Sequence, residues 1–65
     1  MKLDQFLKFQ GWTSTGGEAK SLIRAGLVSV NGLVETRRGR KLINGDQVVL
    51  GTNEALVSET DPTGS

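Results

Sequence analysis

Residues 27–35 read LVSVNGLVE, with β-branched and aliphatic side chains on both sides of an Asn-Gly pair. Asn and Gly both tolerate the positive φ angles of a type I′ turn, so this segment predicts a β-hairpin. A two-residue turn would place Val30 and Leu33 on one face and pair Val34 with Ser29. A three-residue turn would instead bring Val34 beside Val30, and the residues leave both registers open.

Two helical patterns precede the hairpin. Apolar residues recur at spacings of three and four over residues 3–10 and again over residues 19–25, as amphipathic helices require. Gly11 and Gly26 follow these segments and favour helix ends at those positions.

A turn and a further strand follow the hairpin, at residues 44–46 and 47–50. The order of these elements predicts an α+β fold, in which two short N-terminal helices pack on a small, mainly antiparallel β-sheet. We expect this domain to span residues 1–50. Residues 51–65 lose the periodic pattern and become rich in Thr, Ser, Glu and Asp, so we expect an acidic, disordered tail. Within it, residues 55–57 could still add a short edge strand.

Length and composition exclude most enzyme classes. The chain has 65 residues and neither cysteine nor histidine, so it can form one small domain without a disulfide or a Cys/His metal site. The formal net charge is +1, but residues 1–50 carry all eight basic residues and four acidic ones, whereas residues 51–65 carry three acidic residues and no basic one. The predicted domain is therefore basic, and the near-neutral total does not argue against a polyanion partner.

The chain shows no signal for a membrane or for catalysis. No apolar run approaches the roughly 20 residues of a spanning helix, and the first residues lack a signal-peptide pattern, so we expect a cytoplasmic monomer without a membrane partner. The carboxylates of Asp4, Glu18, Glu35 and Asp46 are scattered without evident pairing. We expect no catalytic residue, no metal site and no cofactor, and we interpret Asp46 as a turn residue.

A glycine-rich loop at residues 11–17 precedes the second predicted helix. It is not a nucleotide-binding P-loop, because Gly17 stands where that motif has lysine and a helix precedes the loop. The backbone N–H groups of residues 16–18 could still seat a phosphate at the helix N-terminus, and the alternative is a tight turn between helices. Lys20 and Arg24 lie together on one flank of this helix, where a solvated face is the alternative.

The strongest charge signal is the segment RRGRK at residues 37–41, which holds four cations and no acid. Such a cluster repels itself unless it meets an anion, and guanidinium groups suit bidentate phosphate contacts. We therefore favour polyanion binding over a turn that merely adds solubility.

The aromatic residues are few. Phe6 belongs to the apolar stripe of the first helix, and we expect Phe9, at the margin of that stripe, to cap it. Trp12 lies in the polar loop beside the candidate phosphate seat. It either packs over one end of the core or stacks on an unpaired base.

Three motifs follow one another along the chain, namely LIRAG at residues 22–26, VSVNG at residues 28–32 and GDQV at residues 45–48. In this order, after two helices joined by a glycine-rich loop, they resemble the S4 RNA-binding domain family. STGGEAK at residues 14–20 and RRGRKL at residues 37–42 resemble more closely the small stand-alone bacterial members of that group, the YaaA/YbcJ type.

The resemblance implies structured RNA bound by the second helix, the loop before it and the hairpin region. It suggests ribosomal or transfer RNA, in a ribosome-associated role in translation, while the residues themselves do not distinguish RNA from DNA. Many family members carry Ser-Arg where Thr15 and Gly16 stand here, so a side-chain contact at position 16 is missing. We expect backbone N–H groups and the arginine-rich segment to replace it.

We therefore expect a non-catalytic module that recognises structured RNA through a basic face and a helix N-terminus. The alternative is a protein-interaction module that docks an acidic partner through the same basic segment. The expected RNA-binding residues are Lys2, Gly16, Gly17, Lys20, Arg24, Arg37, Arg38, Arg40 and Lys41.

Overall fold

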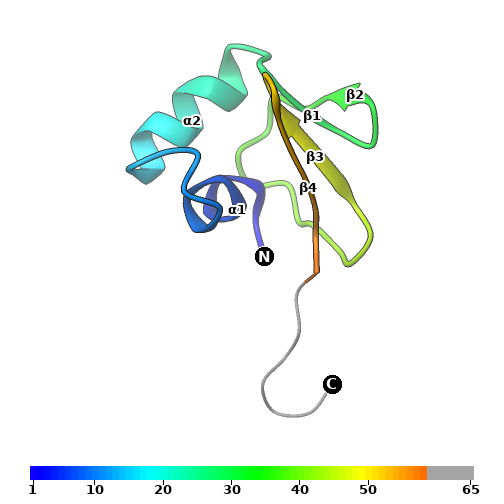
Figure 1. Cartoon of the computed structure of the whole chain (residues 1–65). Coiled ribbons are helices and arrows are strands. Elements are labelled where there is room, and N and C mark those ends of the chain that lie inside the picture. The colour runs from blue at the N-terminus through cyan, green and yellow to red at the C-terminus, as the bar shows by residue number, and fades with distance from the viewer. Residues whose placement is uncertain (59–65) are drawn as a thin grey trace.

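The computed structural model describes residues 1–58, which form two helices and four strands (Figure 1). The four-stranded sheet has the order β2-β1-β3-β4, and every neighbouring pair is antiparallel. Both helices lie on one side of the sheet. The predicted α+β fold, with two N-terminal helices and an antiparallel sheet, is therefore confirmed. The elements are α1 (Leu3–Phe9), α2 (Gly16–Arg24), β1 (Val28–Val30), β2 (Leu33–Val34), β3 (Gln47–Leu50) and β4 (Asn53–Leu56).

The helices form where the apolar spacing predicts them. Helix α2 begins after Thr15, whose Oγ1 accepts a hydrogen bond from the N–H of Glu18 at 3.1 Å. Both helices are followed by a glycine at positive φ, Gly11 at 78° and Gly26 at 79°, which reverses the chain at low steric cost.

The core fills the space between the helices and one face of the sheet. Trp12 packs edge-on against Phe6, with ring centroids 6.1 Å apart and an angle of 87° between the rings, so it covers one end of the core. The buried hydrophobic residues are Leu3, Phe6, Leu7, Ala19, Ile23, Val28, Val30, Leu42, Val48, Leu50 and Val57.

Phe9 does not cap this core, contrary to our prediction. Its side chain is 75% exposed, whereas Phe6, one turn earlier, is 3% exposed. At 100° per residue, Phe9 lies about 110° around the helix from the centre of the buried stripe, so its ring points away from the core.

The hairpin resolves the open question of register. Ser29 pairs with Val34 and Val30 pairs with Leu33, which leaves a two-residue turn at Asn31 and Gly32. These two residues have φ angles of 55° and 84°, as a type I′ turn requires.

Residues 51–58 belong to the fold, where we expected the beginning of a disordered tail with at most a short edge strand at residues 55–57. Strand β4 pairs with β3 over its full length, and Val57 behind it is 3% exposed. The N–H of Val57 donates to the carbonyl of Asp46 at 2.8 Å, and the N–H of Gly45 donates back to Val57 at 2.9 Å. The strand forms through this long-range pairing despite its weak local pattern. Residues 59–65, the rest of the expected tail, lie outside the described residues.

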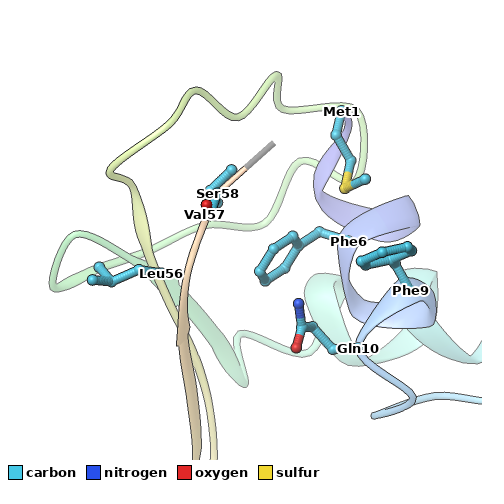
Figure 2. A pocket seen from close by; sticks show the side chains of 7 residues that line it. All are labelled: Met1, Phe6, Phe9, Gln10, Leu56, Val57 and Ser58. Carbon is cyan, nitrogen blue, oxygen red and sulfur yellow. The ribbon is translucent and has the colours of Figure 1, made fainter. Parts of the chain in front are cut away.

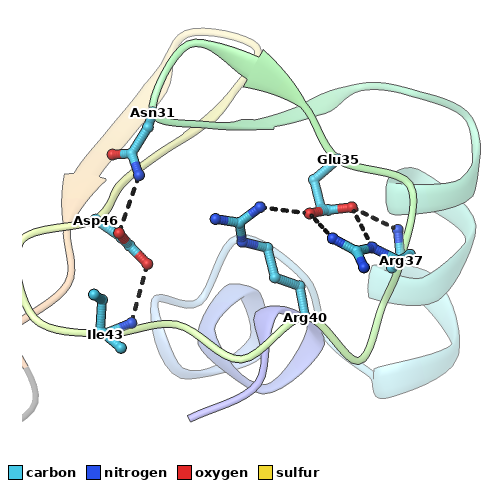
Figure 3. A network of polar contacts seen from close by, with 6 residues as sticks. All are labelled: Asn31, Glu35, Arg37, Arg40, Ile43 and Asp46. Carbon is cyan, nitrogen blue, oxygen red and sulfur yellow. Dashed lines mark hydrogen bonds and ion pairs between the residues drawn. The ribbon is translucent and has the colours of Figure 1, made fainter.

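Asp46 is a turn residue, as its sequence context predicts, and it also links two turns. Its carboxylate accepts one hydrogen bond from the N–H of Ile43 and one from Nδ2 of Asn31, each at 3.0 Å (Figure 3). The side-chain oxygen of Asn31 in turn accepts from the N–H of Gln47 at 3.0 Å. The contact from Ile43, followed by that from Asn31, lowers the pKa of Asp46.

Candidate functional site

The segment 37–41, here called the basic turn, lies across the first turn of helix α1. The N–H of Leu3 donates to the carbonyl of Arg40 at 2.9 Å, and the N–H of Asp4 donates to the carbonyl of Arg38 at 3.2 Å. The first N–H groups of a helix have no partner within the helix, so an outside acceptor satisfies them. The backbone of the basic turn is therefore fastened to the helix that carries much of the core.

Lys2 lies directly beside the basic turn. It forms an isolated antiparallel bridge with Lys41, and the next hydrogen bond of this contact runs from the N–H of Leu42 to the carbonyl of Met1 at 2.8 Å. Residues directly opposite each other in such a pair have their Cβ atoms about 5 Å apart on the same face. The two exposed lysine side chains thus start from neighbouring positions on the same face, and within residues 1–58 neither is paired with a carboxylate.

The buried carboxylate of Glu35 contacts two arginines of the basic turn, Arg37 and Arg40. Glu35 is 7% exposed and accepts from Nη1 of Arg40 at 2.7 Å (Figure 3). It also accepts from Nε, Nη2 and the backbone N–H of Arg37 at 3.1, 3.3 and 3.3 Å. These contacts, those from Arg37 first and that from Arg40 next, lower the pKa of Glu35 to about 2 although burial opposes this.

This arrangement corrects our view of the cluster as four unpartnered cations. We found no acid within residues 37–41 and no pairing for Glu35, but the chain folds back so that Arg37 and Arg40 both reach this carboxylate. Arg38 and Lys41 are exposed and make no ion pair in the described part of the chain. The proximity of Glu35, two residues before the first arginine, was the signal in the sequence that could have revealed the pairing.

The side chains of the basic turn surround a shallow hollow lined by Arg37, Gly39, Arg40 and Lys41. Apart from Gly39 and its two chain neighbours, no heavy atom lies within 4 Å of the position that a Cβ at Gly39 would take, so this side of the hollow is open. The Nε of Arg40 is buried and has no hydrogen-bond partner among residues 1–58. The hollow is therefore cationic and accessible.

A second hollow lies between α1 and β4 and differs in chemistry (Figure 2). Phe6, Phe9 and Leu56 give it an apolar wall, and none of its lining side chains is charged. We therefore do not place an anion there. Its lining residues are Met1, Phe6, Phe9, Gln10, Leu56, Val57 and Ser58.

The N-terminus of α2 offers fewer donors than we predicted. The N–H of Glu18 is already bonded to Thr15, and the Glu18 carboxylate accepts from the N–H of Ser14 at 3.3 Å. Gly16 and Gly17 are exposed, with no obstruction closer than the Thr15 hydroxyl at 3.9 Å from a Cβ built at Gly17. The candidate phosphate-binding site at the N-terminus of α2 therefore retains only the N–H groups of these two glycines, and the carboxylate of Glu18 lies beside them.

The predicted site residues fall into two groups. Lys2 and the basic turn are joined by backbone contacts. Lys20 is partly buried and Arg24 is exposed on α2, and within residues 1–58 no hydrogen bond or ion pair links them to the basic turn.

No group of three or more His, Cys, Asp or Glu side chains among residues 1–58 could hold a metal ion. No helix in this part of the chain is long and apolar enough to cross a membrane.

Comparison with known sequences gives one family and a small set of relatives. A family model described as the S4 domain matches residues 1–58. The "Putative RNA-binding protein YbcJ" of Escherichia coli K12 is 42% identical over 48 residues, which cover 74% of this chain and 69% of that protein. The "Uncharacterized protein YbcJ" of Shigella flexneri matches with the same figures. "Hemolysin A" of Brachyspira hyodysenteriae is 33% identical over 58 residues, or 89% of this chain and 24% of that protein.

Comparison with solved structures supports the fold. A structure titled "Crystal structure of pseudouridylate synthase" superposes with a TM-score of 0.78 at 20% sequence identity. The match covers 92% of this chain and 26% of the synthase. The two proteins therefore share the fold of this region, which is about a quarter of the synthase.

Proposed function

This chain belongs to the S4 domain family, and on that premise we propose that it is a non-catalytic module that binds structured RNA, with ribosomal and transfer RNA as the expected ligands. The observation that carries the proposal is the pairing of Lys2 with Lys41. Like charges directly opposite each other are destabilising, and a phosphate between them would turn the repulsion into attraction.

The cationic side chains of this surface should differ in how strongly they bind phosphate. Lys2, Arg38 and Lys41 are exposed and free of ion pairs within the described residues, so they would contribute most to phosphate binding. Arg37 and Arg40 keep donors that Glu35 does not use. Three to five neutralised phosphates correspond to a slope of about −2 to −4 for the logarithm of affinity against the logarithm of salt concentration.

Helix α2 would provide a second, weaker contact region. The N–H groups of Gly16 and Gly17 can donate to a phosphate at the positive end of the helix, and Lys20 and Arg24 extend along the same element. The carboxylate of Glu18 at this end opposes an anion. We therefore assign the main contribution to the basic turn.

Amide chemical shifts recorded during titration with an RNA hairpin test the proposal. We expect the largest shifts at residues 37–41 and at Lys2, with smaller ones at Gly16 and Gly17. A DNA hairpin of the same sequence tests the preference for RNA, and polyglutamate imitates an acidic protein partner. Absence of shifts with RNA at low salt, or stronger binding of polyglutamate, would overturn the proposal.

A further inference from the structure

Glu35 is the one acidic side chain among residues 1–58 that contacts the basic turn through ion pairs, and it contacts two arginines at once. It lowers the positive charge of a surface that is proposed to bind a polyanion, so on electrostatic grounds alone it should weaken binding. A burial of 93% of its surface and four hydrogen bonds to its carboxylate nevertheless make it part of the fold.

We propose that Glu35 is a positioning residue, which holds the guanidinium groups of Arg37 and Arg40 so that the hollow between them and Lys41 is preformed for one RNA phosphate. This inference rests on the proposed RNA-binding function and adds to it the residue that prepares the site.

The hydrogen bonds leave the required donors free. Glu35 occupies the Nε and Nη2 side of Arg37, so the Nη1 and Nη2 end of the same guanidinium remains available for a bidentate contact. Arg40 gives only Nη1 to Glu35. The side chain of Arg37 is 76% exposed and that of Arg40 is 33% exposed, and both line the hollow.

Preorganisation explains how an acid can favour the binding of an anion. Arginine side chains lose considerable rotamer entropy when they are ordered, and a contact formed during folding removes this loss from the binding step. Glu35 stays ionised throughout the neutral range because its pKa is about 2, so its carboxylate is charged under the conditions in which RNA would bind. Backbone hydrogen bonds from Leu3 and Asp4 fix the turn between them.

The substitution Glu35→Gln separates positioning from electrostatics, with Glu54→Gln as the matched control. Both variants lose one negative charge, and Glu54 is exposed on β4 without an ion pair to a cation in the described residues. We expect Glu35→Gln to weaken the binding of an RNA hairpin about five-fold or more, given the ordering cost of two long side chains. We expect Glu54→Gln to leave the affinity unchanged or to raise it slightly.

The variant Glu35→Asp provides a second test that keeps the net charge and shortens the side chain by one methylene. We expect it to weaken binding as well, and amide spectra of each variant report whether the fold is intact. In the background Arg37→Ala plus Arg40→Ala there is no guanidinium group left to position, so the substitution Glu35→Gln should no longer weaken binding. Tighter RNA binding by Glu35→Gln, or wild-type affinity of Glu35→Asp, overturns the positioning role. The proposed RNA-binding function stands in that case, as long as the wild-type protein binds RNA. No RNA binding by the wild-type protein overturns both.

Discussion

The N–H of Leu3 donates to the carbonyl of Arg40 at 2.9 Å, so a residue without solvent exposure is bonded directly to the basic turn. Leu3 packs in the core, and the side chain of Arg40 contacts the buried carboxylate of Glu35. The candidate interface therefore depends on the packing of α1, and a change in the core will be transmitted to the cationic side chains through the backbone.

The two phenylalanines of α1 provide a matched test of this packing. Phe6→Ala removes a ring that is 3% exposed, so we expect a loss of about 3–5 kcal/mol in the free energy of unfolding, enough to unfold much of a domain of this size. Phe9→Ala removes a ring that is 75% exposed and should change the free energy by about 0.5 kcal/mol or less. Urea denaturation followed by circular dichroism measures both. Similar losses for the two variants would show that Phe9 belongs to the core after all.

The substitution Gly17→Ala should raise the stability of the fold and lower its affinity for RNA. A Cβ at this position meets only the Thr15 hydroxyl at 3.9 Å, so Gly17→Ala should raise the free energy of unfolding by about 0.4–1 kcal/mol, chiefly through the unfolded chain. The added methyl group would hinder the approach of a phosphate to the N-terminus of α2, so RNA affinity should fall. Thermal unfolding and RNA titration of the same variant check both effects. An unchanged affinity would remove this helix end from the interface.

Acid should weaken the fold through Glu35. The pKa of this carboxyl is about 2 in the folded protein, below its ordinary value of 4.5, so its contribution to stability is complete above about pH 4.5 and is lost as the pH falls towards 2. The pKa of Asp46 is also lowered and acts in the same direction. The free energy of unfolding, measured by urea denaturation between about pH 7 and pH 3, should fall below about pH 4.5. The decrease should be smaller in Glu35→Gln, and equal decreases would contradict the role of this carboxyl.

Shortening the chain tests where the folded part ends. A chain that ends after residue 50 lacks β4 and the buried Val57, so we expect it to lose cooperative unfolding. A chain that ends after residue 58 keeps these elements and should retain the wild-type transition apart from small changes. If the shorter chain unfolds like the longer one, residues 51–58 are dispensable, as a disordered tail would be.

The sequence predicts the elements that local chemistry determines. The hairpin could be recognised because Asn31 and Gly32 both accept positive φ, and the helices because buried residues recur at helical spacing. Strand β4 has little local signal: its residues read NEAL, and three of the four are exposed. It forms through pairing with β3, and the local pattern allowed only a short edge strand at residues 55–57.

The candidate site was predictable as a set of cations but not as an arrangement. The basic turn could be found from its composition, whereas its contact with Lys2 depends on a bridge between residues 39 positions apart, Lys2 and Lys41. The pairing of Arg40 with Glu35 requires the chain to fold back over five residues. These two contacts follow from the tertiary fold, whereas the pairing of Arg37 with Glu35 is local and could have been recognised. The sequence therefore suggested four free cations, of which Glu35 in fact binds two.

The salt dependence of RNA binding tests the role of the basic turn most directly. The affinity of the wild-type protein for a labelled RNA hairpin is measured at several salt concentrations, beside the double variant Lys2→Ala plus Lys41→Ala and the control Lys8→Ala, whose lysine is exposed on α1. We predict that the double variant binds more weakly and that its slope is shallower by about 1.5, because two phosphate contacts are lost. Lys8→Ala should keep the wild-type slope. A double variant with the affinity and slope of the wild-type protein would contradict RNA binding through this surface.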